Sequence, residues 1–131
     1  MIWRKSCDRR EVRLPPASLA WLAWWASNAI AGQAMQHWRA ADAQRYLDIY
    51  ERVVGQDADA LERACERLKD GMEKAFFEEN NAKLERALRE QLGPAATPYL
   101  LAREGKRPHT RRGLSLSADA ITLSQSRAGR P

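Results

Sequence analysis

The stretch from Asp57 to Gly93 constrains the fold more than any other stretch of the sequence. It carries residues typical of a helix start, apolar residues that share one helical face, and a glycine that can end the helix. Asp59 and Glu62 are spaced like a capping box at a helix start. Gly93 can take the left-handed conformation that often ends a helix. Between them, apolar side chains at spacings of four, three, four and four residues share one helical face: Leu61, Cys65, Leu68, Met72 and Phe76.

Two features interrupt this pattern. Gly71 lies in its middle and costs a helix about 1 kcal/mol relative to Ala. After Phe76 the apolar stripe slips by one position, to Phe77 and Leu84, beside the polar run Glu78 to Asn81. Either Asn of that run has the side chain to cap a second short helix. We nevertheless predict one long helix with a kink, over about residues 57–92.

Residues 17–38 contain no formal charge and all but one of the five Trp residues. A membrane span is disfavoured because Ser, Asn and Gln interrupt the stretch. A secretory signal is disfavoured because Asp8 and Glu11 lie in the leading region and Pro15-Pro16 precede the apolar run. We predict a helix that is apolar over much of its circumference. Such a helix needs cover on several sides, from its own domain or from another chain.

Residues 40–54 predict a further helix that ends at Gly55. Either Asp42 caps its start, or the helix continues the previous one through His37 and Trp38. The short turn from Gly55 to Asp59 is typical of two antiparallel helices. A DNA-binding helix-turn-helix is disfavoured, because the second helix would present Asp59 and Glu62 to phosphate oxygens. We therefore predict an ordinary helical hairpin.

Together these segments predict an all-α protein, a small helical hairpin or three-helix domain with extended basic ends. Three regions are expected: a basic arm at residues 1–16, a helical domain at 17–93 and a C-terminal tail at 94–131. Pro and Gly residues preclude a long helix in the tail. Leu116, Ile121 and Leu123 hint at a short strand, but no partner strand is evident. The last 25 or so residues are expected to be extended or disordered unless a partner orders them.

The net charge of +5 is concentrated at the two ends of the chain. Residues 1–13 hold five basic and two acidic groups, whereas residues 56–92 hold seven basic and ten acidic groups. Basic ends attract phosphates or acidic protein surfaces, although they can also serve solubility alone. The residues predicted to bind nucleic acid or an acidic partner are Arg4, Lys5, Arg9, Arg10, Arg13, Lys106, Arg107, Arg111 and Arg112.

No pattern of catalytic chemistry stands out in the sequence. It has no Gly-rich phosphate loop, zinc-ligand spacing or nucleophile elbow. A solvated helix flank explains the acidic residues of the long helix more simply than an acid/base pair does. We expect no enzyme activity, no cofactor and no metal. The two Cys residues stand far apart, which favours a reducing compartment and a cytoplasmic location.

The sequence therefore predicts a non-enzymatic binding protein, an adaptor, inhibitor or regulator that contacts another protein and self-associates. Its predicted protein interface consists of Trp21, Trp24, Trp25, Leu61, Leu68, Met72, Phe76 and Phe77. Trp is enriched at binding hot spots, although a core Trp cluster is common in a small domain. Two alternatives stay open: a nucleic-acid-associated protein that uses both basic arms, and an exported or membrane-attached protein headed by residues 17–38.

Overall fold

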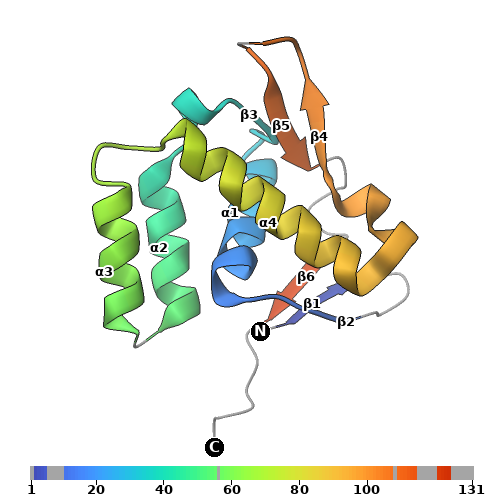
Figure 1. Cartoon of the computed structure of the whole chain (residues 1–131), viewed down its shortest axis with the longest axis horizontal. Helices are drawn as coiled ribbons and strands as arrows, with labels where there is room; N and C mark the ends of the chain where they lie inside the picture. The colour runs from blue at the N-terminus through green and yellow to red at the C-terminus, as the bar shows by residue number, and fades with distance from the viewer. Residues whose placement is uncertain (1, 6–10, 56, 108, 115–120, 125–131) are drawn as a thin grey trace, which may run out of the picture.

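A computed structural model describes residues 2–5, 11–55, 57–107, 109–114 and 121–124. These residues form a mostly helical protein that also contains two three-stranded antiparallel sheets (Figure 1). The helices are α1 (Pro16–Ile30), α2 (Ala43–Val54), α3 (Ala58–Arg67) and α4 (Lys74–Leu92), with the 3-10 helices η1 (Trp38–Ala40) and η2 (Gly93–Tyr99). The strands are β1 (Ile2–Lys5), β2 (Glu11–Arg13), β3 (Met35–Gln36), β4 (Leu101–Glu104), β5 (Arg111–Leu114) and β6 (Ile121–Ser124). The expectation of a purely all-α protein was wrong.

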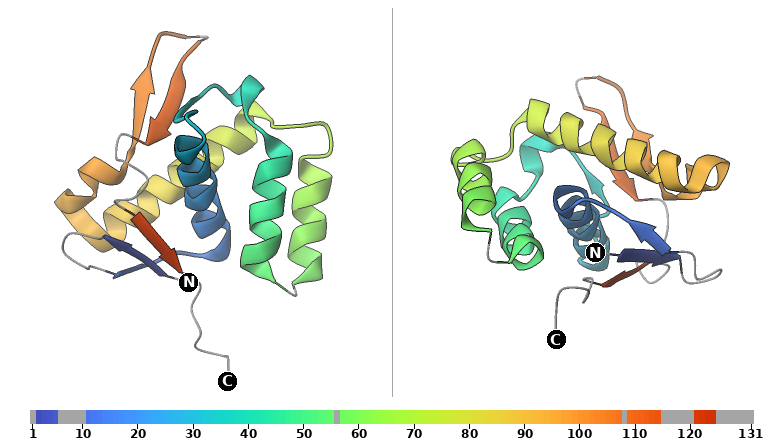
Figure 2. Two further views of the ribbon diagram at one scale, coloured as in Figure 1. Left: turned by 180° about the vertical axis from the view of Figure 1, so that it is seen from behind. Right: turned by 60° about the horizontal axis from the view of Figure 1, so that its bottom comes forward.

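Helix α1 lies at the centre of the molecule and is covered on several sides. It contacts α2, α4 and β5. Figure 2 shows it between α2 and the strands β1 and β2, with α4 crossing it. Leu19, Leu22 and Ala26 are all buried. The breadth of its apolar surface is therefore explained within this chain, because neighbouring elements cover different faces of the same helix.

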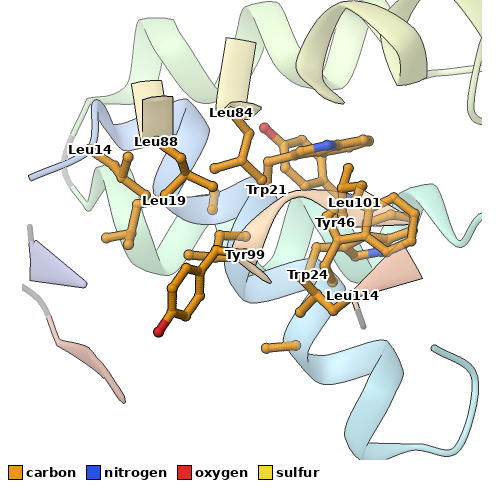
Figure 3. Packing of buried hydrophobic residues seen from close by; sticks show 14 of the residues in the cluster. Leu14, Leu19, Trp21, Trp24, Tyr46, Leu84, Leu88, Tyr99, Leu101 and Leu114 are labelled. Carbon is orange, nitrogen blue, oxygen red and sulfur yellow. The ribbon is translucent and has the colours of Figure 1, made fainter. Parts of the chain in front are cut away.

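The tryptophans of α1 form the core with residues of α2 and α4 (Figure 3). The ring of Trp21 stacks on that of Trp24 with centroids 4.9 Å apart, and meets Tyr46 edge-on at 5.2 Å. The indole nitrogen of Trp24 donates to the carbonyl oxygen of Asp42 at 3.2 Å. Burial raises the pKa of the Tyr46 phenol above its usual range, so that this ring stays neutral in the core.

Helices α2 and α3 form the predicted antiparallel hairpin. The carboxylate of Asp42 accepts from the backbone N–H of Arg45 at 3.0 Å and caps α2, as in the first of the two alternatives. Gly55 ends α2 with φ 62°, a conformation that glycine adopts without steric cost. The cap of α3 is Asp57, whose carboxylate accepts from Ala60 N–H at 3.0 Å. It is not Asp59, which lies in the first turn.

The single long helix predicted for residues 57–92 is two helices. The break lies between Leu68 and Glu73, and it turns at Gly71, where φ is 101°. The polar run from Glu78 to Asn81 causes no break, since α4 continues through it. The stripe slips there because Asn80 and Asn81 are themselves buried. Gly93 ends α4 as predicted, with φ 58°.

Two short sheets replace the extended ends expected from the sequence. In the first, the order is β2-β1-β6, so that Trp3 pairs with both Val12 and Leu123. In the second, the order is β3-β5-β4, and Gly113 pairs with both Met35 and Ala102. The strand hinted at by Ile121 and Leu123 therefore has a partner, at the opposite end of the chain.

Candidate functional site

A cleft of about 410 Å³ lies where η1, the first half of α4 and the β4–β5 hairpin converge. Figure 1 shows the three elements together at the top of the molecule, with the hairpin projecting beyond the helices. Residues of α4 line the cleft at helical spacing, so that one face of the helix forms its floor. The lining residues are His37, Trp38, Arg39, Lys74, Phe77, Glu78, Asn81, Ala82, Glu85, Arg103, Arg107, Thr110 and Arg112.

The charges around the cleft are predominantly positive. Its five cations are Arg39, Lys74, Arg103, Arg107 and Arg112, and its two carboxylates are Glu78 and Glu85. One carboxylate is already engaged, because Glu85 Oε2 accepts from Arg112 Nη2 at 3.1 Å and from Leu101 N–H at 2.9 Å. Cations converging on one concavity raise the local concentration of anions. The cleft therefore favours an anionic ligand.

Asn81 lies on the floor of the cleft with one side of its amide unused. Its Oδ1 accepts from the indole nitrogens of Trp21 at 2.8 Å and Trp25 at 3.3 Å. An indole N–H only donates, so the oxygen must face the tryptophans and the amide nitrogen must face away. Asn81 is 2% exposed, and its Nδ2 has no hydrogen-bond partner among the described residues.

Arg112 contributes a second unused donor to the same cleft. Its side chain is 14% exposed, and Nη2 donates to Glu85 and, at 3.3 Å, to the carbonyl oxygen of Leu101. Its Nε has no partner within the described part of the chain. A buried donor without an acceptor costs about 1–3 kcal/mol. Both nitrogens are shielded from solvent, and Asn28 Nδ2, away from the cleft, is a further donor of this kind.

Trp38 places an aromatic surface in the cleft. It belongs to η1, which begins after His37, whose Nδ1 accepts from Arg39 N–H at 3.1 Å. The His37 and Trp38 ring centroids are 5.8 Å apart, and the guanidinium carbon of Arg39 lies 5.2 Å from the Trp38 ring centre. Trp38 is half-buried and Arg39 is exposed.

The residues predicted as a protein interface lie mostly inside the protein. Trp21, Trp24 and Trp25 are fully buried, which confirms that at least two of them are buried. In this fold they belong to the core, where no partner can touch them. Leu68 and Phe77 are also buried, while Leu61, Met72 and Phe76 are half-buried. Among the described residues, Ile30 is the one large hydrophobic side chain that is exposed, at 78%.

The predicted cationic residues do not gather into one patch. Arg4 and Lys5 belong to β1, whereas Arg9 and Arg10 lie outside the described residues. Arg13 is exposed on β2, where its backbone N–H and carbonyl both bond to the Gln91 side chain. In the hairpin, Lys106 is exposed, Arg111 pairs with Glu104, and only Arg107 and Arg112 line the cleft.

Sequence reasoning missed Trp38, Arg39, Lys74, Arg103 and Asn81 as site residues. Three of them are ordinary surface cations in the sequence, and only the fold brings them together. Asn81 did leave a signal, since the apolar stripe slips beside it. A polar residue at an apolar position of a helix is worth testing as a buried hydrogen-bonding group.

Two further searches bear on the class of protein. Within the described ranges, no group of three or more His, Cys, Asp or Glu residues is placed to hold a metal ion. None of the helices in that part of the chain combines the length and apolarity needed to cross a membrane.

The fold thus defines a mostly helical domain with two small antiparallel sheets and a cationic cleft. Comparison with protein-family models, with curated proteins and with solved structures found no match.

Proposed function

We propose that this is a non-enzymatic binding protein, an adaptor or regulator that holds an anionic part of a partner in the cleft. The observation that supports it is the excess of cations over carboxylates around one concavity. Charged and hydrogen-bonding groups in such a cleft orient and select a ligand. The proposed compartment is the cytoplasm.

The distribution of charge favours the cleft over the rest of the described surface as the binding site for an anion. Ion pairs and hydrogen bonds balance charges elsewhere, as between Arg67 and Glu73 at 2.7 Å or Lys69 and Glu66 at 3.0 Å. In the cleft, Arg39, Arg103 and Arg107 line one concavity, whose carboxylates are Glu78 and Glu85. Charges within about 10 Å act together at moderate salt. The cleft is accordingly the strongest candidate for contact with a polyanion.

The position of the proposed contact differs from that predicted from the sequence. The apolar surface that suggested binding and self-association is largely covered by the chain itself. Self-association stays a prediction, which light scattering at micromolar concentration tests. Partner binding is now proposed through charge, at a cleft lined by three cations of the C-terminal segment: Arg107 and Arg112, which were predicted to bind, and Arg103, which was not.

A pair of charge-reversal variants tests the proposal. R103E/R107E removes two cations from the cleft, and R86E/R89E removes two exposed cations of α4 that do not line it. Both lower the net charge by the same amount. On a heparin column, R103E/R107E should elute at clearly lower salt than R86E/R89E, since only the former disrupts converging charges. Equal elution of the two variants would contradict a specific anion site.

A further inference from the structure

Resting on that proposed function, we infer that the anionic partner is a single strand of nucleic acid. One base stacks on Trp38, and the phosphates on either side meet the cationic rim. Proteins that bind single strands combine a positively charged groove with aromatic side chains that stack on bases. The cleft brings these two features together, from segments of the chain that are far apart.

Trp38 is the feature that favours nucleic acid over an acidic peptide. Carboxylates of a peptide would neutralise the rim, but they offer no flat partner for an indole ring. Every base has such a face, whatever its sequence. Because Arg39 is exposed, a base can displace its guanidinium from the Trp38 ring. The displaced cation then lies beside the phosphate that follows the stacked base.

The size of the cleft favours an unpaired strand over a duplex. At about 410 Å³ it falls near the lower end of the range for small-ligand sites, roughly 300–1,000 Å³. A base inside a duplex is stacked on its neighbours and must be flipped out before it can meet a side chain in a pocket. An unpaired base is free to enter, and its phosphates remain at the rim.

Fluorescence anisotropy with three labelled probes of equal length and matched charge tests the inference. The probes are an oligothymidylate, an abasic strand with the same phosphates, and an oligoglutamate. We expect the oligothymidylate to bind about tenfold more tightly than the abasic strand, since stacking one base contributes about that factor. The affinity should fall with salt by a log–log slope of about −0.7 for each phosphate neutralised.

Variants of Trp38 then assign the difference to the cleft. W38A should reduce the affinity for oligothymidylate to that for the abasic strand, whereas W38F should keep part of the difference. Circular dichroism checks that each variant folds, because Trp38 also packs against the core. The comparison of the oligothymidylate with the abasic strand uses the unaltered protein. It therefore tests base stacking even if W38A fails to fold.

Each remaining outcome decides one of the two proposals. Equal binding of the oligothymidylate and the abasic strand overturns the single-strand inference and leaves the anion-binding function in place. Binding of oligoglutamate alone overturns the nucleic-acid inference and supports an acidic protein partner. Absence of binding to all probes at low salt overturns both.

Discussion

Two hairpins project from the central helices, and they are held in different ways. The α2–α3 hairpin consists of two capped helices, with Asp42 and Asp57 at their starts and Gly55 between them. The β4–β5 hairpin has short strands, and its contact with α4 includes the pair of Glu85 with Arg112. The helix ends of the helical hairpin are thus fixed by residues close in sequence, whereas the strand hairpin is joined to α4 by residues far apart in sequence.

The two hairpins also differ in charge and in their relation to the cleft. Exposed Asp and Glu alternate with Arg on α3, where Arg67 pairs with Glu73. The strand hairpin carries Arg103, Arg107 and Arg112 into the cleft, with one exposed ion pair, Arg111 with Glu104. The helical hairpin, with the clearest local signals, therefore contributes no residue to the lining of the cleft, whereas the strand hairpin contributes Arg103, Arg107, Thr110 and Arg112.

The largest expected effect concerns the anchor of the helical hairpin. Tyr46 is 2% exposed and contacts the rings of Trp21 at 5.2 Å and Phe76 at 5.8 Å. Y46A leaves a large cavity beside the tryptophans and should lower the free energy of unfolding by about 3–5 kcal/mol. Urea denaturation measures it. Y50A, at a half-buried ring on the same helix, is the matched control and should cost clearly less.

A smaller effect is expected at Gly113, in the strand hairpin. A Cβ there would lie 2.2 Å from the carbonyl oxygen of Ala34 and 2.7 Å from the sulfur of Met35. Because the closest atom belongs to the backbone of the neighbouring strand, it cannot simply rotate away. G113A should therefore cost about 1–3 kcal/mol by overpacking and separate β3 from β5. Urea denaturation again measures the change.

Gly55, which lies in the helical hairpin, provides the control for Gly113. A Cβ at Gly55 meets no atom within 4 Å, so that only its positive φ of 62° opposes a side chain. G55A should cost about 1–3 kcal/mol, because L-residues rarely adopt the backbone conformation of Gly55, with φ 62° and ψ −111°. G55A should also leave binding in the cleft unchanged, whereas G113A should weaken it. Equal effects of the two variants on binding would show that the strand hairpin does not position the site.

The same contrast explains which features the sequence predicted. Helix caps and stops are local, and Asp42, Gly55 and Gly93 were identified correctly because each acts within four residues of its partner. The strands were missed because they are two to four residues long and pair across the chain, as Ile2 does with Ser124. A strand this short carries too little periodicity to be detected without its partner.

The candidate site was missed for a related reason. The predicted binding cations were placed at the two ends of the chain, whereas Trp38 reaches the hairpin cations only through the fold. The boundary between the helical domain and the tail stays a prediction. In the structure, residues on both sides of it line the cleft, with Asn81 from α4 and Arg112 from β5. A site built across predicted regions cannot be found by examining each region separately.

The smallest expected effect concerns the cap at the start of α3, which is one of the local interactions of the helical hairpin. The spacing of Asp59 and Glu62 suggested that Asp59 is the cap, but the carboxylate that accepts from the backbone is that of Asp57. D57A should lower the free energy of unfolding by about 1 kcal/mol, because Ala60 N–H loses its acceptor. D59A removes only a favourable charge from the first turn and should cost about 0.3–1 kcal/mol at low ionic strength, falling as salt is added. The two are separated by urea denaturation at low and high salt: the effect of D57A should persist, since a lost hydrogen bond is not screened as a charge–dipole interaction is. If D59A were the costlier variant at high salt, the helix would begin two residues later than the structure places it.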